Sequence, residues 1–228
     1  MMGIDKCVAF CRLERLALGL VSLIGATVLG AWLLPTFAGW LPEQWHIMTA
    51  STALGLLVSS AGLLSTQHPS RLAQGVAAGS VVLVVALVAV SVLMHLSTDV
   101  KLWPAMTEGA LVRPMSLQTD MGLALVAAYI WLSKGAERSP AQAVILVLLF
   151  GLCLVVTNGY FENQWVMVGQ TPLIRTSAHT LTCLWLLWLV GVMQYRLRGS
   201  APMQASQGLG EVVTARVLNL IRALTDGS

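Results

Sequence analysis

The stretch from Arg71 to Asp99 reads RLAQGVAAGSVVLVVALVAVSVLMHLSTD. No Asp, Glu, Lys or Arg lies between its two ends, and Val, Leu and Ala fill most of it. A helix needs about 20 apolar residues to cross a hydrocarbon layer about 30 Å thick. The stretch is therefore predicted to be a transmembrane helix, and it indicates an integral membrane protein.

Similar apolar runs recur along the 228 residues, of which 57% are hydrophobic and only 10% charged. The runs are rich in Leu, Ala and Gly and lack the alternation of a membrane barrel, so helices are favoured over strands. We predict an all-α, polytopic membrane helix bundle with about six transmembrane helices. The predicted spans are 16–38, 47–66, 73–97, 117–133, 140–158 and 176–195.

Basic residues indicate the orientation, because they accumulate in cytoplasmic loops. With the N-terminus in the cytoplasm, every Lys and Arg except Lys101, Arg113 and Arg175 falls on the cytoplasmic side. The net charge of +3 thus reports topology, and we do not interpret it as a nucleic-acid signal. We expect a cytoplasmic segment at 1–15, a six-helix domain at 16–195, and a cytoplasmic linker and helix at 196–228.

A short pattern recurs where the second, fourth and sixth spans begin. The three copies read Met48-Thr-Ala-Ser-Thr52, Met115-Ser-Leu-Gln-Thr119 and Thr176-Ser-Ala-His-Thr180. Each has a Thr four residues after its first residue and a small residue three further on. We predict three repeated helical hairpins with these starts at the outer face. A Thr here can also simply bond back to its own helix or to a neighbour.

The Met-Ser-x-x-Thr pattern, preceded by the Val92-to-Leu102 stretch VLMHLSTDVKL, resembles the MASE-like N-terminal membrane sensor regions of bacterial signalling proteins. Met48 to Leu54 matches best, whereas Asp120 and Thr176 depart from the family pattern. The resemblance implies a sensory domain in the bacterial inner membrane with both termini in the cytoplasm. It also implies an output histidine kinase or diguanylate cyclase module, in the same chain or in a partner.

The C-terminal segment regains helical periodicity after a polar linker. Val213, Val217, Leu220 and Leu224 form a short apolar seam. The seam is compatible with a coiled coil, which would make the protein a homodimer, and equally with an amphipathic helix on the cytoplasmic leaflet.

Polar side chains within or beside the spans are candidate site residues, because ionisable groups are costly in a bilayer. Asp120 has an alternative reading as a carboxylate that stabilises a helix N-terminus. Histidines at one depth can bind haem b or a metal ion, or can be unconnected interfacial residues. The expected ligand-binding residues are Thr52, Thr119, Asp120, Thr180, Trp45, Trp103 and Trp165, and the expected metal or haem ligands are His95, His179 and His46.

The sequence shows no phosphate-binding loop, metal-ligand run or nucleophile motif, so we expect no enzymatic activity. The leading hypothesis is a sensory input domain that binds a lipid-soluble or periplasmic ligand and acts through the C-terminal helix. The alternatives are a haem- or metal-binding redox protein and a small transporter. The cofactor stays unknown at this stage.

Overall fold

The computed structural model describes residues 4–34, 48–68, 70–96, 115–135, 139–165 and 176–198. Every regular element in these ranges is an α-helix. The helices are α1 (Ile4–Leu33), α3 (Ala50–Ser65), α4 (Arg71–Leu96), α6 (Leu117–Leu132), α7 (Pro140–Trp165) and a last helix, Ala178–Arg198. We refer to the last one as the 178–198 helix.

The helices coincide with the predicted spans within a few residues at most ends. Two are longer, since α1 begins at Ile4 instead of residue 16 and α7 ends at Trp165 instead of residue 158. Polar residues can extend a membrane helix beyond its apolar run, because the backbone hydrogen-bond ladder does not depend on side-chain hydropathy.

Four helices are long and apolar enough to cross a membrane, namely α1, α4, α7 and the 178–198 helix. The other two, α3 and α6, have 16 residues each. At 1.5 Å per residue such a helix is about 24 Å long, less than the hydrocarbon thickness. The all-helical prediction is confirmed, and membrane-spanning character is supported for four of the six described helices.

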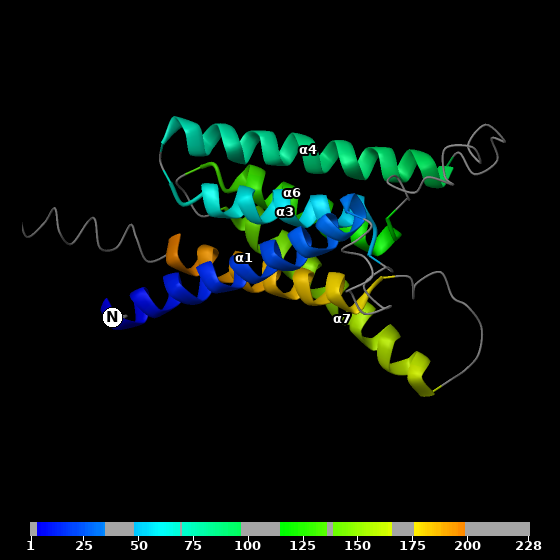
Figure 1. Ribbon diagram of the computed structural model, residues 1–228. Helices are drawn as coiled ribbons and strands as arrows, with labels where there is room; N and C mark the ends of the chain where they lie inside the picture. The colour runs from blue at the N-terminus through cyan, green and yellow to red at the C-terminus, as the bar shows by residue number, and fades with distance from the viewer. Residues whose placement is uncertain are drawn as a thin grey trace, which may run out of the picture.

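The helices form an inner and an outer set (Figure 1). In their membrane-length segments, α1, α4 and α7 are 33%, 28% and 28% buried, against 50% for the 178–198 helix. The short helices also lie inside, because α3 contacts α1, α4 and α6, while α6 contacts α3, α4 and α7. We call α3, α6 and the 178–198 helix the inner helices. The outer helices point Leu and Val side chains away from the protein, as expected of helices that face lipid.

Small residues let the inner helices approach one another closely. A Cβ atom added to Gly55 would lie 2.7 Å from Leu123 Cδ1, and one added to Gly122 would lie 2.9 Å from Leu184 Cδ2. Both leucines have no exposed surface. Glycine at these positions gives each leucine room to pack against the neighbouring backbone, which is how helices associate in membranes.

Candidate functional site

The three inner helices begin with the same hydroxyl cap, at what we call the cap end of the molecule. The residue before each helix accepts a hydrogen bond on its side-chain oxygen from the backbone N–H three residues later. The donor and acceptor pairs are Thr52 and Thr49 at 3.3 Å, Thr119 and Ser116 at 3.3 Å, and Thr180 and Ser177 at 3.2 Å. The hydroxyl groups of each pair are also bonded to each other, at 2.9, 2.7 and 2.8 Å.

A side chain of an outer helix is hydrogen-bonded to the residue before each cap. We call the side chain's residue the gripping residue and its partner the gripped residue. In each case a ring N–H or O–H near the end of the outer helix donates to the backbone carbonyl of that residue. The pairs are Trp32 Nε1 to the Met48 oxygen at 3.0 Å, His95 Nε2 to the Met115 oxygen at 2.7 Å, and the Tyr160 hydroxyl to the Thr176 oxygen. The Thr that recurs in the sequence therefore occurs where three parts meet: an outer-helix donor, the backbone carbonyl that it bonds, and the hydroxyl cap after that carbonyl. We call each such arrangement a joint.

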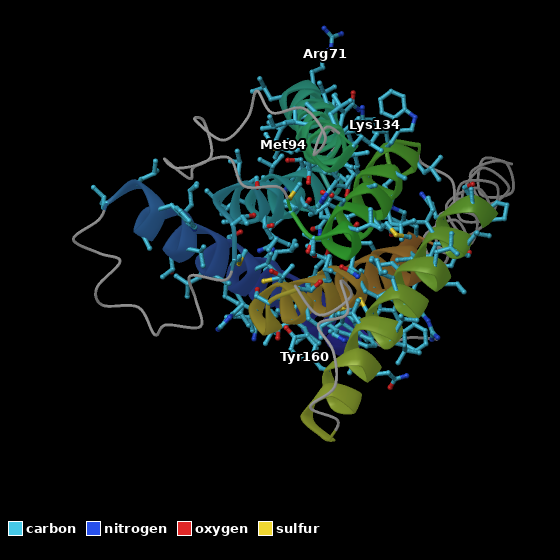
Figure 2. All side chains as sticks on the ribbon, turned by 90° about the vertical axis from the view of Figure 1, so that its right-hand side faces the viewer. Arg71, Met94, Lys134 and Tyr160 are labelled. Carbon is cyan, nitrogen blue, oxygen red and sulfur yellow. The ribbon has the colours of Figure 1, made fainter. Side chains whose placement is uncertain are left out.

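Figure 2 views the bundle from the cap end and labels Met94 on α4 and Tyr160 on α7. Of these two residues, Tyr160 lies beside the start of the 178–198 helix. Two of the joints are linked directly, because Ser116 Oγ lies 2.9 Å from Thr176 Oγ1. The cap residue of α6 is thus hydrogen-bonded to the residue before the cap of the 178–198 helix.

The joint between α4 and α6 contains a buried polar cluster. Ser91 Oγ donates to Asp120 Oδ2 at 2.9 Å and accepts the Met115 N–H at 2.9 Å. Asp120 is 1% exposed, and its Oδ1 has no hydrogen-bond partner. His95 interacts electrostatically with this carboxylate. A buried carboxylate oxygen without a donor is costly, so this cluster is a candidate for a functional role.

The other end of the inner helices carries a second polar cluster around Glu14 of α1. Its carboxylate, 1% exposed, accepts hydrogen bonds from Gln67, just after α3, and from Gln194 Nε2 at 2.6 Å. Gln194 also donates to the Leu63 carbonyl at 3.1 Å. We call this the Glu14 cluster, and it joins three helices through one carboxylate.

Arg198 holds the 178–198 helix to α6 near the same end, because its Nη1 donates to the Ser133 carbonyl at 2.7 Å. Tyr129 of α6 adds a buried bond to the Gly191 carbonyl at 2.8 Å. The 178–198 helix is therefore hydrogen-bonded to its neighbours towards its C-terminal end as well as beside its start.

The predicted site residues divide into two groups. Thr52, Thr119 and Thr180 occupy equivalent buried positions in the caps, and Asp120 lies one residue beyond Thr119. His95 grips Met115, and His179 lies in the first turn of its helix. Outside the described part of the chain are Trp45, Trp103, His46 and the Trp165 side chain, together with the predicted C-terminal helix at 196–228 beyond Arg198.

Among the described residues, no group of three or more His, Cys, Asp or Glu side chains is placed to hold a metal ion. Ser91 and Glu14 were not among the predicted site residues. Ser91 is a polar residue one turn before His95 in an apolar run, and Glu14 is a carboxylate between two arginines at the start of another. Both polar residues stand out in the sequence, but the sequence does not show which side chain each one bonds.

These features describe an α-helical protein with a membrane-type exterior and two buried polar clusters. Comparisons with protein-family models, curated proteins and solved structures found no match to this chain.

Proposed function

We propose that this chain is a sensory input domain of a bacterial signalling protein, embedded in the inner membrane by six helices. The three recurrent joints support an origin as three helical hairpins. The exposed cations of the described chain support a cytoplasmic Glu14 end, because Arg12, Arg15, Arg71, Lys134 and Arg196 all lie near it. The cap end then faces outward.

One observation carries the proposal: hydrogen bonds join the 178–198 helix region to other elements at both ends. Thr176 bonds to Ser116 at the cap end, and Gln194 bonds to Glu14 at the other. The chain then continues directly into residues 199–228. A change of hydrogen bonding at the cap end can therefore bias the position of the segment that leaves the bundle.

The proposed stimulus is a lipid-soluble or periplasmic ligand that binds between the hairpins at the cap end. The proposed output is a kinase or cyclase module in the same chain or in a partner, reached through an amphipathic helix in 196–228 that pairs two copies. Such a ligand shifts the output only if it binds one arrangement of the bundle more tightly than the other.

The test is a chimaera in which residues 1–228 are followed by a diguanylate cyclase domain. Thr176→Val removes the bond between Ser116 and Thr176 and is expected to change the cyclase rate severalfold. Thr182→Val is the matched control, because Thr182 is exposed and its hydroxyl donates to the Ala178 carbonyl of its own helix. Equal cyclase rates for wild type and both variants would contradict the proposed relay.

A further inference from the structure

The three joints at the cap end share the hydroxyl cap and the bonded preceding carbonyl, and only the second joint contains a carboxylate. Positions equivalent to Asp120, five residues after the gripped residue, are Ala53 in the first joint and Leu181 in the third. Ala53 is fully buried and Leu181 is partly buried. The same joint thus forms twice without a carboxylate, so the architecture does not need Asp120.

Ser91, the hydrogen-bond partner of Asp120, is likewise polar in the second joint only. Ser91 lies one turn before the gripping residue His95, and the equivalent residues are Val28 before Trp32 and Val156 before Tyr160. Both valines are buried, as Ser91 is. The second joint therefore replaces an apolar pair by a serine and a carboxylate that are hydrogen-bonded to each other.

Most polar atoms of this cluster are committed. The Ser91 hydroxyl both donates and accepts, the His95 Nε2–H is bonded to the Met115 carbonyl, and Asp120 Oδ2 is bonded to Ser91. The atom left over is Asp120 Oδ1, which is buried without a donor. A buried oxygen in this state lacks a partner that a bound positive species would supply.

We propose that Asp120 is a proton-binding site and that the stimulus read at the cap end is external acidity. A proton from solvent forms an O–H bond on the carboxylate, and the cluster loses one negative charge. A proton is favoured over a metal ion because it needs one oxygen, and no group of metal-binding side chains surrounds this position among the described residues. The proposal rests on the function proposed above.

The hydrogen bonds leading away from Asp120 indicate how protonation would be transmitted. A neutral carboxyl accepts the Ser91 hydroxyl more weakly than a carboxylate does. Ser91 in turn holds the Met115 N–H, next to the cap residue Ser116 that bonds to Thr176. Protonation therefore loosens the joint between α4 and α6 at the point where it meets the 178–198 helix.

Other titratable groups at the cap end must be separated from Asp120. His95 on α4 interacts with it electrostatically, Tyr160 lies on α7 and His179 lies in the first turn of the 178–198 helix. Glu14, the other buried carboxylate of the described chain, lies at the opposite end and is a suitable comparison.

The experiment measures amide hydrogen exchange of the whole chain in lipid nanodiscs across a pH series, after division by the intrinsic exchange rates. We expect a transition of about one proton per chain in peptides covering 115–125 and 178–198. Asp120→Asn should abolish the transition, and Glu14→Gln should leave it in place. A transition that persists in Asp120→Asn would overturn the proposal.

Ser91→Ala provides a second readout that a purely structural role would not produce. It removes the donor that favours the charged carboxylate, so the transition should move to higher pH by about one unit or more. An unmoved transition would count against Asp120, and a transition that appears only with added sodium or a divalent cation would replace the proton by a metal ion.

The two proposals fail separately. A transition at 115–125 that depends on Asp120, with no change at 178–198, would support the proton site and contradict the relay. A Thr176→Val effect on the chimaera, with no pH transition in the nanodiscs, would support the relay and overturn the proton site.

Discussion

At the scale of single residues, the buried carboxylates differ in how well they are satisfied. Glu14 receives amide hydrogen bonds from two other segments, whereas Asp120 receives one bond and leaves an oxygen unpaired. Charged groups inside membrane proteins face the protein interior and are retained where they have a role. The bonding pattern therefore favours a structural role for Glu14 and agrees with the proton-binding role proposed for Asp120.

The structural role of Glu14 predicts a stability loss. Glu14→Ala removes an acceptor from the buried Gln194 amide, and an unsatisfied buried polar group costs about 1–3 kcal/mol. The exposed Gln67 amide can bond to water instead. Glu14→Gln keeps an acceptor oxygen and should cost less. The free energy of unfolding in mixed detergent and SDS micelles measures both. Equal values for the two variants would show that the amide bonds contribute nothing.

At the scale of helices, the caps of the inner helices should contribute to stability in proportion to their bonds. Removing a hydroxyl cap typically costs about 1 kcal/mol. We expect this from Ser177→Ala and a larger loss from Ser116→Ala, because Ser116 also bonds to Thr176. The same unfolding assay tests the difference, with the exposed Thr182→Ala as the control. A smaller loss for Ser116→Ala than for Ser177→Ala would exclude a stabilising link between the helices.

Packing between α6 and the 178–198 helix leads to a second prediction at this scale. Gly122→Val places methyl groups against the buried Leu184, and overpacking a filled core costs about 1–3 kcal/mol. Gly151→Val on α7 is the matched control, because no atom lies within 4 Å of a Cβ there. The measurement is the midpoint of thermal unfolding in detergent, which should fall for Gly122→Val alone. An equal fall in both variants would contradict the tight contact.

At the scale of the whole molecule, the positions of the helices were predictable and their arrangement was not. Long apolar runs predict helices because a chain in lipid must satisfy its backbone hydrogen bonds internally, and each of the six predicted ranges contains a helix. Inner and outer faces could not be separated, because valines lie on both the buried and the exposed side of α4. The Thr pattern located the caps, but its partners on the outer helices are a Trp, a His and a Tyr, which share no sequence pattern.

The hydrogen bond between Ser91 and Asp120 could not be predicted from the sequence for a related reason. The two residues are 29 positions apart on different helices, and only the packing of α4 on α6 brings them together. Glu14 could be read as part of a basic cytoplasmic segment, since α1 was expected to begin at residue 16 and not at Ile4. A residue near the edge of a predicted span can thus belong to the core.

The arrangement of the whole bundle predicts the accessibility of its two ends. His68, after α3, and Lys134, after α6, are both exposed near the Glu14 end, so His68→Cys and Lys134→Cys should react with a membrane-impermeant thiol reagent from the cytoplasmic side only. Each helix of 16 residues must then reach across the membrane from its cap, which requires local thinning of the bilayer or tilted neighbours. Labelling in inside-out and right-side-out vesicles decides this, with the unsubstituted chain as the control for its four native cysteines. Reaction of one substituted cysteine from the outer side would show that its helix does not cross, and reaction of both would leave only the four long helices as spans.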